Sequence, residues 1–106
     1  MMFFNHPAVR GHLLKHGWVY TLRDRRKREG LHVLAHGRRF EFERLGHGWV
    51  EAVKDLPRLD ARRVRPYVRG SGFGRATEWF EAFEEMHGAR RGPAFLYRVE
   101  LLDRSP

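Results

Sequence analysis

The chain of 106 residues contains no cysteine. This absence excludes a disulfide scaffold, a thiolate zinc site, an iron–sulfur cluster and a cysteine nucleophile. No uncharged apolar run approaches the ~20 residues that a membrane-spanning helix needs. The first residues, Met1 to Pro7, also lack the basic segment that opens a signal peptide. We therefore expect a cytoplasmic protein that does not associate with a membrane.

Lysine is scarce as well. Lys15, Lys27 and Lys54 are the only lysines, and all other positively charged residues are arginines. Lys and Arg together number 21 against 13 Asp and Glu, giving a net charge of +8. The arginine excess alone fits a GC-rich genome, such as that of a thermophile, but the positive residues also cluster, in segments 10–44 and 58–75. A planar guanidinium suits phosphates and base edges, so this clustering favours a polyanionic partner.

Hydrophobic residues make up 42% and aromatic residues 13% of the chain, which is typical of a folded protein. The length allows one hydrophobic core, so we predict a single domain over residues 1–106. Asn5 and Pro7 predict the start of a helix and Gly17 its end. Strands are predicted over 18–23, 31–35, 39–45 and 49–54, with Phe40 and Phe42 facing the core and a hairpin turn at 46–48.

The second half predicts helices before a last strand. Asp60 caps a short helical stretch that Pro66 limits, and 70–74 is a glycine-rich loop. Segment 77–87 predicts a helix whose apolar stripe consists of Trp79, Phe80, Phe83 and Met86. Segment 95–102 is apolar on both faces, which indicates a central strand. The expected fold is α+β, a small, mixed and partly closed barrel of about five strands with two or three packed helices.

A short helix, a glycine and a strand that reads T-x-R at Thr21 and Arg23 resemble the opening of ASCH domains, small members of the PUA-like β-barrel group. Segment 66–74, followed by a helix that contains Glu78 and Trp79, is similar to the helical insert of that family. The strand over 95–102 is similar to its final strand. The resemblance covers nearly the whole chain, and it implies a PUA-like barrel with a cleft for RNA or a modified nucleoside.

Some ASCH members are amidohydrolases that remove the acetyl group of N4-acetylcytidine, and some have been described as ribonucleases. The amidohydrolases carry the pattern K-x-x-T-x-R and a later glutamate. Thr21 and Arg23 match this pattern, but Trp18 stands at the lysine position and no carboxylate lies between Asp60 and Glu78. Amide hydrolysis needs an activated nucleophile and a proton carrier. We therefore expect a binding module, with Thr21 as the catalytic candidate if the chain is an enzyme.

Several residues are candidates for contacts with RNA, and each has a structural alternative. Trp18 is either a stacking platform or a core residue beside Tyr20 and Leu22. Thr21 and Arg23 share a strand face that would line the groove, although Arg23 would also fit a surface ion pair. Phosphate contacts are predicted for the basic run, which is otherwise a solvated loop, with extensions further along the chain: Arg25, Arg26, Lys27, Arg28, Arg38, Arg39, Arg62, Arg63 and Arg65.

Ser71 and Phe73 lie in the glycine-rich loop, which is either an anion-binding nest near the cleft or a turn anchored by Phe73. His12 and His16 have the i, i+4 spacing of metal ligands, but no third ligand is indicated. We therefore expect neither a metal nor a cofactor. Three functions remain open: binding of RNA or a modified nucleoside, hydrolysis of a nucleoside amide or of RNA, and a protein adaptor whose basic face meets an acidic partner.

Overall fold

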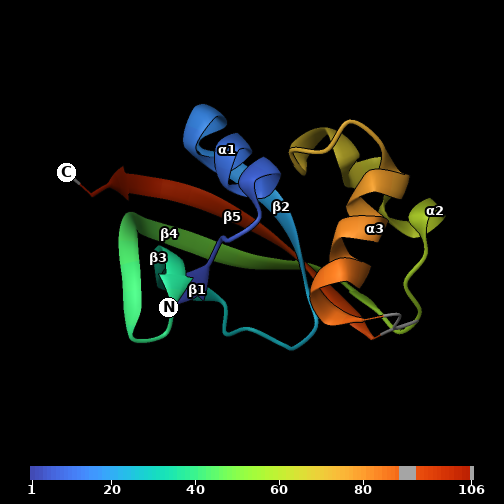
Figure 1. The fold of residues 1–106 in the computed structure, drawn as a ribbon, viewed down its shortest axis with the longest axis horizontal. Coiled ribbons are helices and arrows are strands. Elements are labelled where there is room, and N and C mark those ends of the chain that lie inside the picture. The colour runs from blue at the N-terminus through green and yellow to red at the C-terminus, as the bar shows by residue number, and fades with distance from the viewer. Residues whose placement is uncertain (89–92, 106) are drawn as a thin grey trace.

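Two long strands form the centre of a five-stranded sheet in the computed structural model, which describes residues 1–88 and 93–105 (Figure 1). The strand order is β1-β3-β4-β5-β2, where β1 pairs parallel to β3 and every other pair is antiparallel. The sheet curls into a half-barrel, which confirms the expected α+β class with a mixed sheet of five strands. The strands are β1 (Met2–Phe3), β2 (Trp18–Arg23), β3 (Gly30–Arg38), β4 (Glu41–Leu56) and β5 (Ala94–Arg104).

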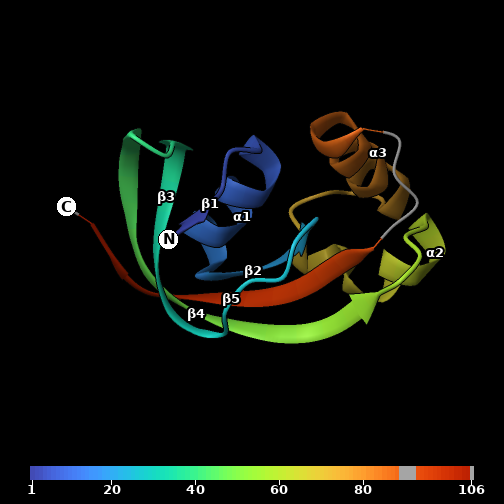
Figure 2. The same ribbon diagram turned by 90° about the horizontal axis from the view of Figure 1, so that it is seen from below.

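Helices α1 (Pro7–His16) and α3 (Ala76–His87) lie on the same side of the curled sheet (Figure 2). A short α-helix, α2 (Ala61–Val64), and a 3-10 helix, η1 (Arg65–Gly70), continue into each other beside α3. One core cluster joins α1 to the sheet, and a second joins α2 and α3 to the ends of β2, β4 and β5. None of the helices described is long and apolar enough to cross a membrane.

The start of α1 differs from the prediction, because His6 rather than Asn5 caps the helix. Nδ1 of His6 accepts a hydrogen bond from the Ala8 N–H at 3.1 Å. The Asn5 amide instead donates to the Gly37 carbonyl at 2.9 Å and accepts from the Gly37 N–H at 2.8 Å. Parallel pairing of β1 with β3 brings Asn5 beside Gly37, so its side chain serves the sheet and the next residue takes over the cap.

The predicted hairpin turn at 46–48 is wrong, because β4 runs without interruption through these residues. A Cβ atom on Gly46 would lie 1.9 Å from the Asp103 carbonyl oxygen, and one on Gly48 would lie 2.5 Å from the Leu34 side chain. These glycines therefore permit close approach of neighbouring strands at an irregularity of the β4–β5 pairing. The chain reverses earlier, at 39–40, which leaves Phe40 91% and Phe42 40% exposed rather than facing the core.

Other local predictions are confirmed, with an exception at the end of α3. Strand β2 has the predicted bounds, and the Asp60 carboxylate accepts from the Arg63 N–H at 2.9 Å at the start of α2. Trp79 and Phe83 are buried on the predicted apolar stripe of α3, whereas Met86 is half exposed at its end. Strand β5 has β4 and β2 as its neighbours, which makes it an inner strand as expected.

Candidate functional site

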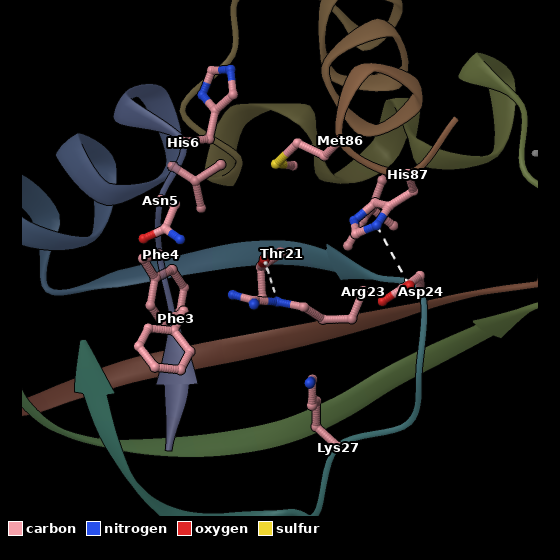
Figure 3. Close-up of a pocket in the computed structure, with 12 residues that line it drawn as sticks. Phe3, Phe4, Asn5, His6, Thr21, Arg23, Asp24, Lys27, Met86 and His87 are labelled. Carbon is pink, nitrogen blue, oxygen red and sulfur yellow. Dashed lines mark hydrogen bonds and ion pairs between the residues drawn. The ribbon is translucent and has the colours of Figure 1, made fainter. Parts of the chain in front are cut away.

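The curled sheet stays open between its two edge strands, β1 and β2. A pocket of about 200 Å³ occupies this seam (Figure 3). We call it the seam pocket. Its walls come from the end of β1, the start of α1, the second half of β2, the segment after β2 and the end of α3, and include Phe3, Phe4, Asn5, His6, Thr21, Arg23, Asp24, Lys27, Met86 and His87.

Arg23 reaches across the seam from β2 toward the β1 side (Figure 3). Its guanidinium carbon lies 4.8 Å from the centroid of the buried Phe4 ring, and its Nε donates to Oγ1 of the buried Thr21 at 3.1 Å. Burial lowers the pKa of Arg23 to about 10, and the neighbouring Asp24 carboxylate opposes this shift. Arg23 is therefore a cation at neutral pH that has lost part of its hydration, and its position is fixed by two buried neighbours.

Lys27 enters the same pocket from the segment after β2. The hydroxyl of the buried Tyr97 accepts from the Lys27 N–H at 2.6 Å and donates to the Lys27 carbonyl at 3.1 Å. Both bonds hold the backbone at the point where the lysine side chain turns into the seam. Sequence reasoning missed Tyr97, although a hydroxyl among the inward apolar residues of β5 is a signal that a polar partner lies inside.

We call residues 24–29, which carry the predicted basic run, the strap. Arg26 pairs with Asp55 at 2.8 Å, and Nε2 of His32 lies 2.6 Å from the Arg28 carbonyl oxygen. The Glu29 carboxylate accepts from the Ala52 N–H at 3.2 Å. These contacts connect the strap to β3, β4 and β5. Arg25 and Arg28 remain exposed along it.

A carboxylate and an imidazole meet at another wall of the seam pocket. Nδ1 of His87 lies 3.5 Å from the Asp24 carboxylate, which connects the end of α3 to the end of β2 (Figure 3). Phe83, one turn earlier on α3, supports the His87 ring at 4.6 Å between centroids. The pocket therefore combines two cations, a hydroxyl and an acid–histidine pair with apolar walls. Such a set suits a ligand that is partly anionic and partly aromatic.

Trp18 lies outside the seam pocket, on the opposite face of β2 from Thr21 and Arg23. Its ring makes edge contacts with His12 and Tyr20, and the Arg98 guanidinium carbon lies 5.1 Å from the ring centroid. A Cβ atom on Gly70 would come within 2.5 Å of the Trp18 ring. Trp18 is half-buried and contacts Tyr20 next to η1. Its role as a stacking platform stays a prediction.

The glycine-rich loop contacts residues that line the seam pocket. The buried Ser71 hydroxyl donates to the Val68 carbonyl at 2.6 Å and accepts from the Phe73 N–H at 3.1 Å, so it shapes the turn. Phe73 contacts the His6 ring at 4.8 Å between centroids. It also lines a cavity of about 30 Å³ that shares Thr21 and Met86 with the seam pocket. The loop thus packs against the wall of the pocket through Phe73.

The remaining predicted arginines lie on two surfaces away from the strap. Arg38 and Arg39 are exposed at the end of the β3–β4 hairpin, directly after the Gly37 that Asn5 binds. Arg62, Arg63 and Arg65 are exposed around α2, where Arg63 pairs with Asp60 at 3.3 Å. The hairpin arginines therefore belong to a segment tied to the pocket, whereas no contact described here ties the α2 arginines to it.

The His12 and His16 rings lie 4.4 Å apart on α1. Burial lowers the pKa of His12, and the nearby His16 and Lys15 lower it further. Within residues 1–88 and 93–105, no group of three or more histidine, aspartate or glutamate side chains is arranged to hold a metal ion.

Comparison of the chain with protein-family models, with curated proteins and with solved structures gives no match. The likeness to ASCH domains stays a prediction from the motifs of the sequence. A function must therefore be inferred from the residues of the seam pocket themselves.

Proposed function

We propose that this chain binds RNA, or a modified nucleotide, and that the seam pocket holds one nucleotide. The observation that carries the proposal is the meeting of Arg23, Lys27 and Thr21 in one pocket. Its volume of about 200 Å³ is below the ~300–1,000 Å³ of sites for drug-sized ligands. The space therefore suits a single base or phosphate rather than a large ligand.

The environment of Arg23 supports binding of an acceptor-rich ligand. Phe4 covers one face of the Arg23 guanidinium group. Among the described residues, the only hydrogen bond that this group donates runs from its Nε to Oγ1 of Thr21. The terminal nitrogens thus remain for a phosphate or for a base edge, which a planar fork binds in two-point fashion. Because water is partly excluded, the attraction is stronger than at an open surface.

An unpaired nucleotide is the natural occupant of a narrow seam. Bases inside an RNA duplex are stacked, and the deep groove of the duplex hides their edges. A splayed nucleotide can enter the seam, where Phe3 offers a ring and Lys27 a charge. The exposed Arg25 and Arg28 of the strap then attract the flanking phosphates with little regard to sequence.

The test is binding of labelled single-stranded RNA, hairpin RNA and duplex DNA across a salt series. We expect RNA with unpaired nucleotides to bind more tightly than duplex DNA at every salt concentration. Arg23→Ala should remove that preference, whereas Arg26→Ala, whose charge already pairs with Asp55, should retain it. Equal binding of all three nucleic acids by the unchanged protein would contradict the proposal. Absence of any binding would favour the adaptor with an acidic partner.

A second candidate function is hydrolysis of a nucleoside amide such as N4-acetylcytidine, or of RNA. One observation favours this second candidate. Lys27 and the Asp24–His87 pair line the same pocket as Thr21, although none of them belongs to the K-x-x-T-x-R pattern. Lys15 lies exposed at the end of α1 and does not line the pocket. A hydroxyl nucleophile needs a base that takes its proton, and this pair and the lysine are the groups at hand.

Turnover of N4-acetylcytidine, measured beside the binding series, separates the two candidates. A hydrolase of this kind acts on the free nucleoside, depends little on salt and loses turnover in Thr21→Val. A binding module shows no turnover, requires a longer strand and loses affinity as salt rises. Turnover that survives in Thr21→Val would remove this hydroxyl from the second candidate.

A further inference from the structure

The tip of the β3–β4 hairpin departs from two usual preferences, the burial of aromatic side chains and the choice of turn residues. Phe40 exposes 91% of its surface, although a phenylalanine ring is normally buried. The hairpin reverses at Arg39 and Phe40, where two-residue turns favour Asn-Gly or Gly residues with positive φ. Neither Arg39 nor Phe40 has a positive φ. The residues at the tip therefore serve neither the turn nor the core, and such departures concentrate at functional sites.

The hairpin is held in a fixed position relative to the seam pocket. Phe42 contacts Phe3 edge-on, with 6.1 Å between ring centroids, and Asn5 binds Gly37 through two hydrogen bonds. Phe3 and Asn5 both line the seam pocket. The hairpin curls up on the side of the sheet that carries α1 and α3 (Figure 2). A ligand that occupies the pocket can therefore extend along the hairpin toward its tip.

The neighbours of Phe40 suit a nucleic acid. The Arg39 guanidinium carbon lies 5.4 Å from the Phe40 ring centroid, and Arg38 is exposed beside it with Glu41 as its cross-strand partner. Arg39 is thus the cation that lies against the ring. An aromatic ring with an adjacent arginine is the combination that stacks a base and contacts its phosphate.

We propose that Phe40 is a second contact for the RNA strand, where its ring stacks on an unpaired base while the seam pocket holds another nucleotide of the same strand. This inference rests on the proposed binding of RNA. It adds a length requirement, because a strand must reach from the pocket to the tip before Phe40 contributes. The ligand class is thus single-stranded RNA of several nucleotides rather than a free nucleotide.

The test compares cytidine monophosphate with single-stranded RNAs of increasing length, each against the unchanged protein and Phe40→Ala. Loss of one stacked base weakens binding about 5- to 150-fold. We expect that loss only for strands above a threshold length, with unchanged binding of cytidine monophosphate. Phe40→Trp should restore the affinity, and its added fluorescence should change on RNA binding relative to the protein with its 3 natural tryptophans. Leu31→Ala is the matched control, because it truncates an exposed apolar side chain at the end of β3 that is remote from the hairpin turn.

A second variant separates folding from binding at the tip. Combined Arg39→Asn and Phe40→Gly introduces the turn residues that a two-residue hairpin favours. We expect an equal or higher Tm together with the same loss of affinity for long RNA. A variant that retains this affinity would show that the tip residues are not contacts.

The outcomes distinguish this inference from the proposed function. If the unchanged protein binds no RNA, both fail. If RNA binding depends on Arg23 but Phe40→Ala matches the unchanged protein at every length, the hairpin contact alone is overturned. If the fluorescence of Phe40→Trp responds to vesicles of phosphatidylserine and not to RNA, the tip is a membrane contact and the inference is overturned as well.

Discussion

Arg23 and Arg26 are three positions apart in the chain, yet the fold gives them opposite surroundings. Arg23 lies against buried Phe4 and Thr21 in the seam pocket, and burial lowers its pKa to about 10. The Arg26 side chain is 71% exposed and pairs with Asp55. An exposed pair of this kind contributes about 0–1 kcal/mol and is screened by salt. Placement in the fold, more than the abundance of arginine, decides which positive charge can select a ligand.

Exchange of each arginine for lysine gives the largest expected effect on this comparison. Arg23→Lys keeps a positive charge but loses the planar fork and the hydrogen bond from Nε to Thr21. A hydrogen bond to a charged group is worth about 1.5–3 kcal/mol, so binding of single-stranded RNA should weaken about 10- to 100-fold. Arg26→Lys should change the affinity less than about threefold. Fluorescence anisotropy at one salt concentration measures both, and equal losses would contradict the distinction.

Tyr97→Phe tests whether the position of Lys27 matters as well as its charge. The variant removes both hydrogen bonds to the Lys27 backbone but retains the buried ring. We expect a loss of about 1–2 kcal/mol in the free energy of unfolding, a Tm lower by roughly 5–10 °C, and RNA affinity reduced severalfold at temperatures where the variant is folded. Calorimetry and anisotropy measure the two effects. Unchanged affinity beside a lower Tm would limit Tyr97 to a structural role.

The exposed arginines of the strap should control the dependence on salt rather than the choice of ligand. Each lost phosphate contact on a single strand lowers the slope of log K against log salt by about 0.7. Arg25→Ala combined with Arg28→Ala should therefore flatten the slope more than Arg25→Ala combined with Arg26→Ala, because Arg26 is already paired with Asp55. The preference for unpaired RNA should remain in both variants. Equal slopes for the two pairs would show that the ion pair opens on binding.

The smallest expected effect is on the pH dependence of stability. Burial lowers the pKa of Arg23, and burial of the two side chains also lowers the pKa of His12 and the pKa of His32. For His12, the nearby His16 and Lys15 add repulsion, and for His32 a hydrogen bond to the Arg28 carbonyl opposes the shift. The unfolded chain therefore binds protons first as the pH falls through ~6.5. Stability is fully present above that pH and declines below it.

Thermal unfolding across this pH range measures the decline. His12→Gln combined with His32→Gln should flatten the dependence of Tm on pH, and each single change should remove part of it. A slope that persists in the double variant would assign the acid sensitivity to other groups.

Local sequence patterns predicted the elements that depend on short-range preferences. The alternation of aromatic and β-branched residues placed β2 at its observed bounds, and this alternation also set Thr21 and Arg23 on one face. The glycines at 46 and 48 misled the prediction, because glycine marks close approach between strands as well as turns. The alternation over residues 39–45 predicts that Phe40 and Phe42 face the core, but the chain reverses at 39–40 and both side chains are exposed.

Local sequence patterns do not predict the seam pocket. Phe4 meets Arg23 only because the sheet curls until β1 and β2 face each other across an open seam. Lys27 and His87 reach that seam from a strap and from a helix end, and each is positioned by a distant partner, Tyr97 or Asp24. Such contacts depend on how long-range pairing bends the sheet. A pattern such as K-x-x-T-x-R covers only residues up to the end of the strand. It therefore does not indicate Lys27, which lies after β2 and lines the same pocket.

The most direct test of the central claim is the NMR signal of the Arg23 Nε–H group during titration with a short single-stranded RNA. The account predicts a saturable shift of this signal that persists when salt is raised, with smaller and salt-sensitive shifts for Arg25 and Arg28. A stationary Arg23 signal, with shifts confined to the exposed arginines and abolished by salt, would contradict it. The seam pocket would then be a structural gap, and the basic surface would bind polyanions by charge alone.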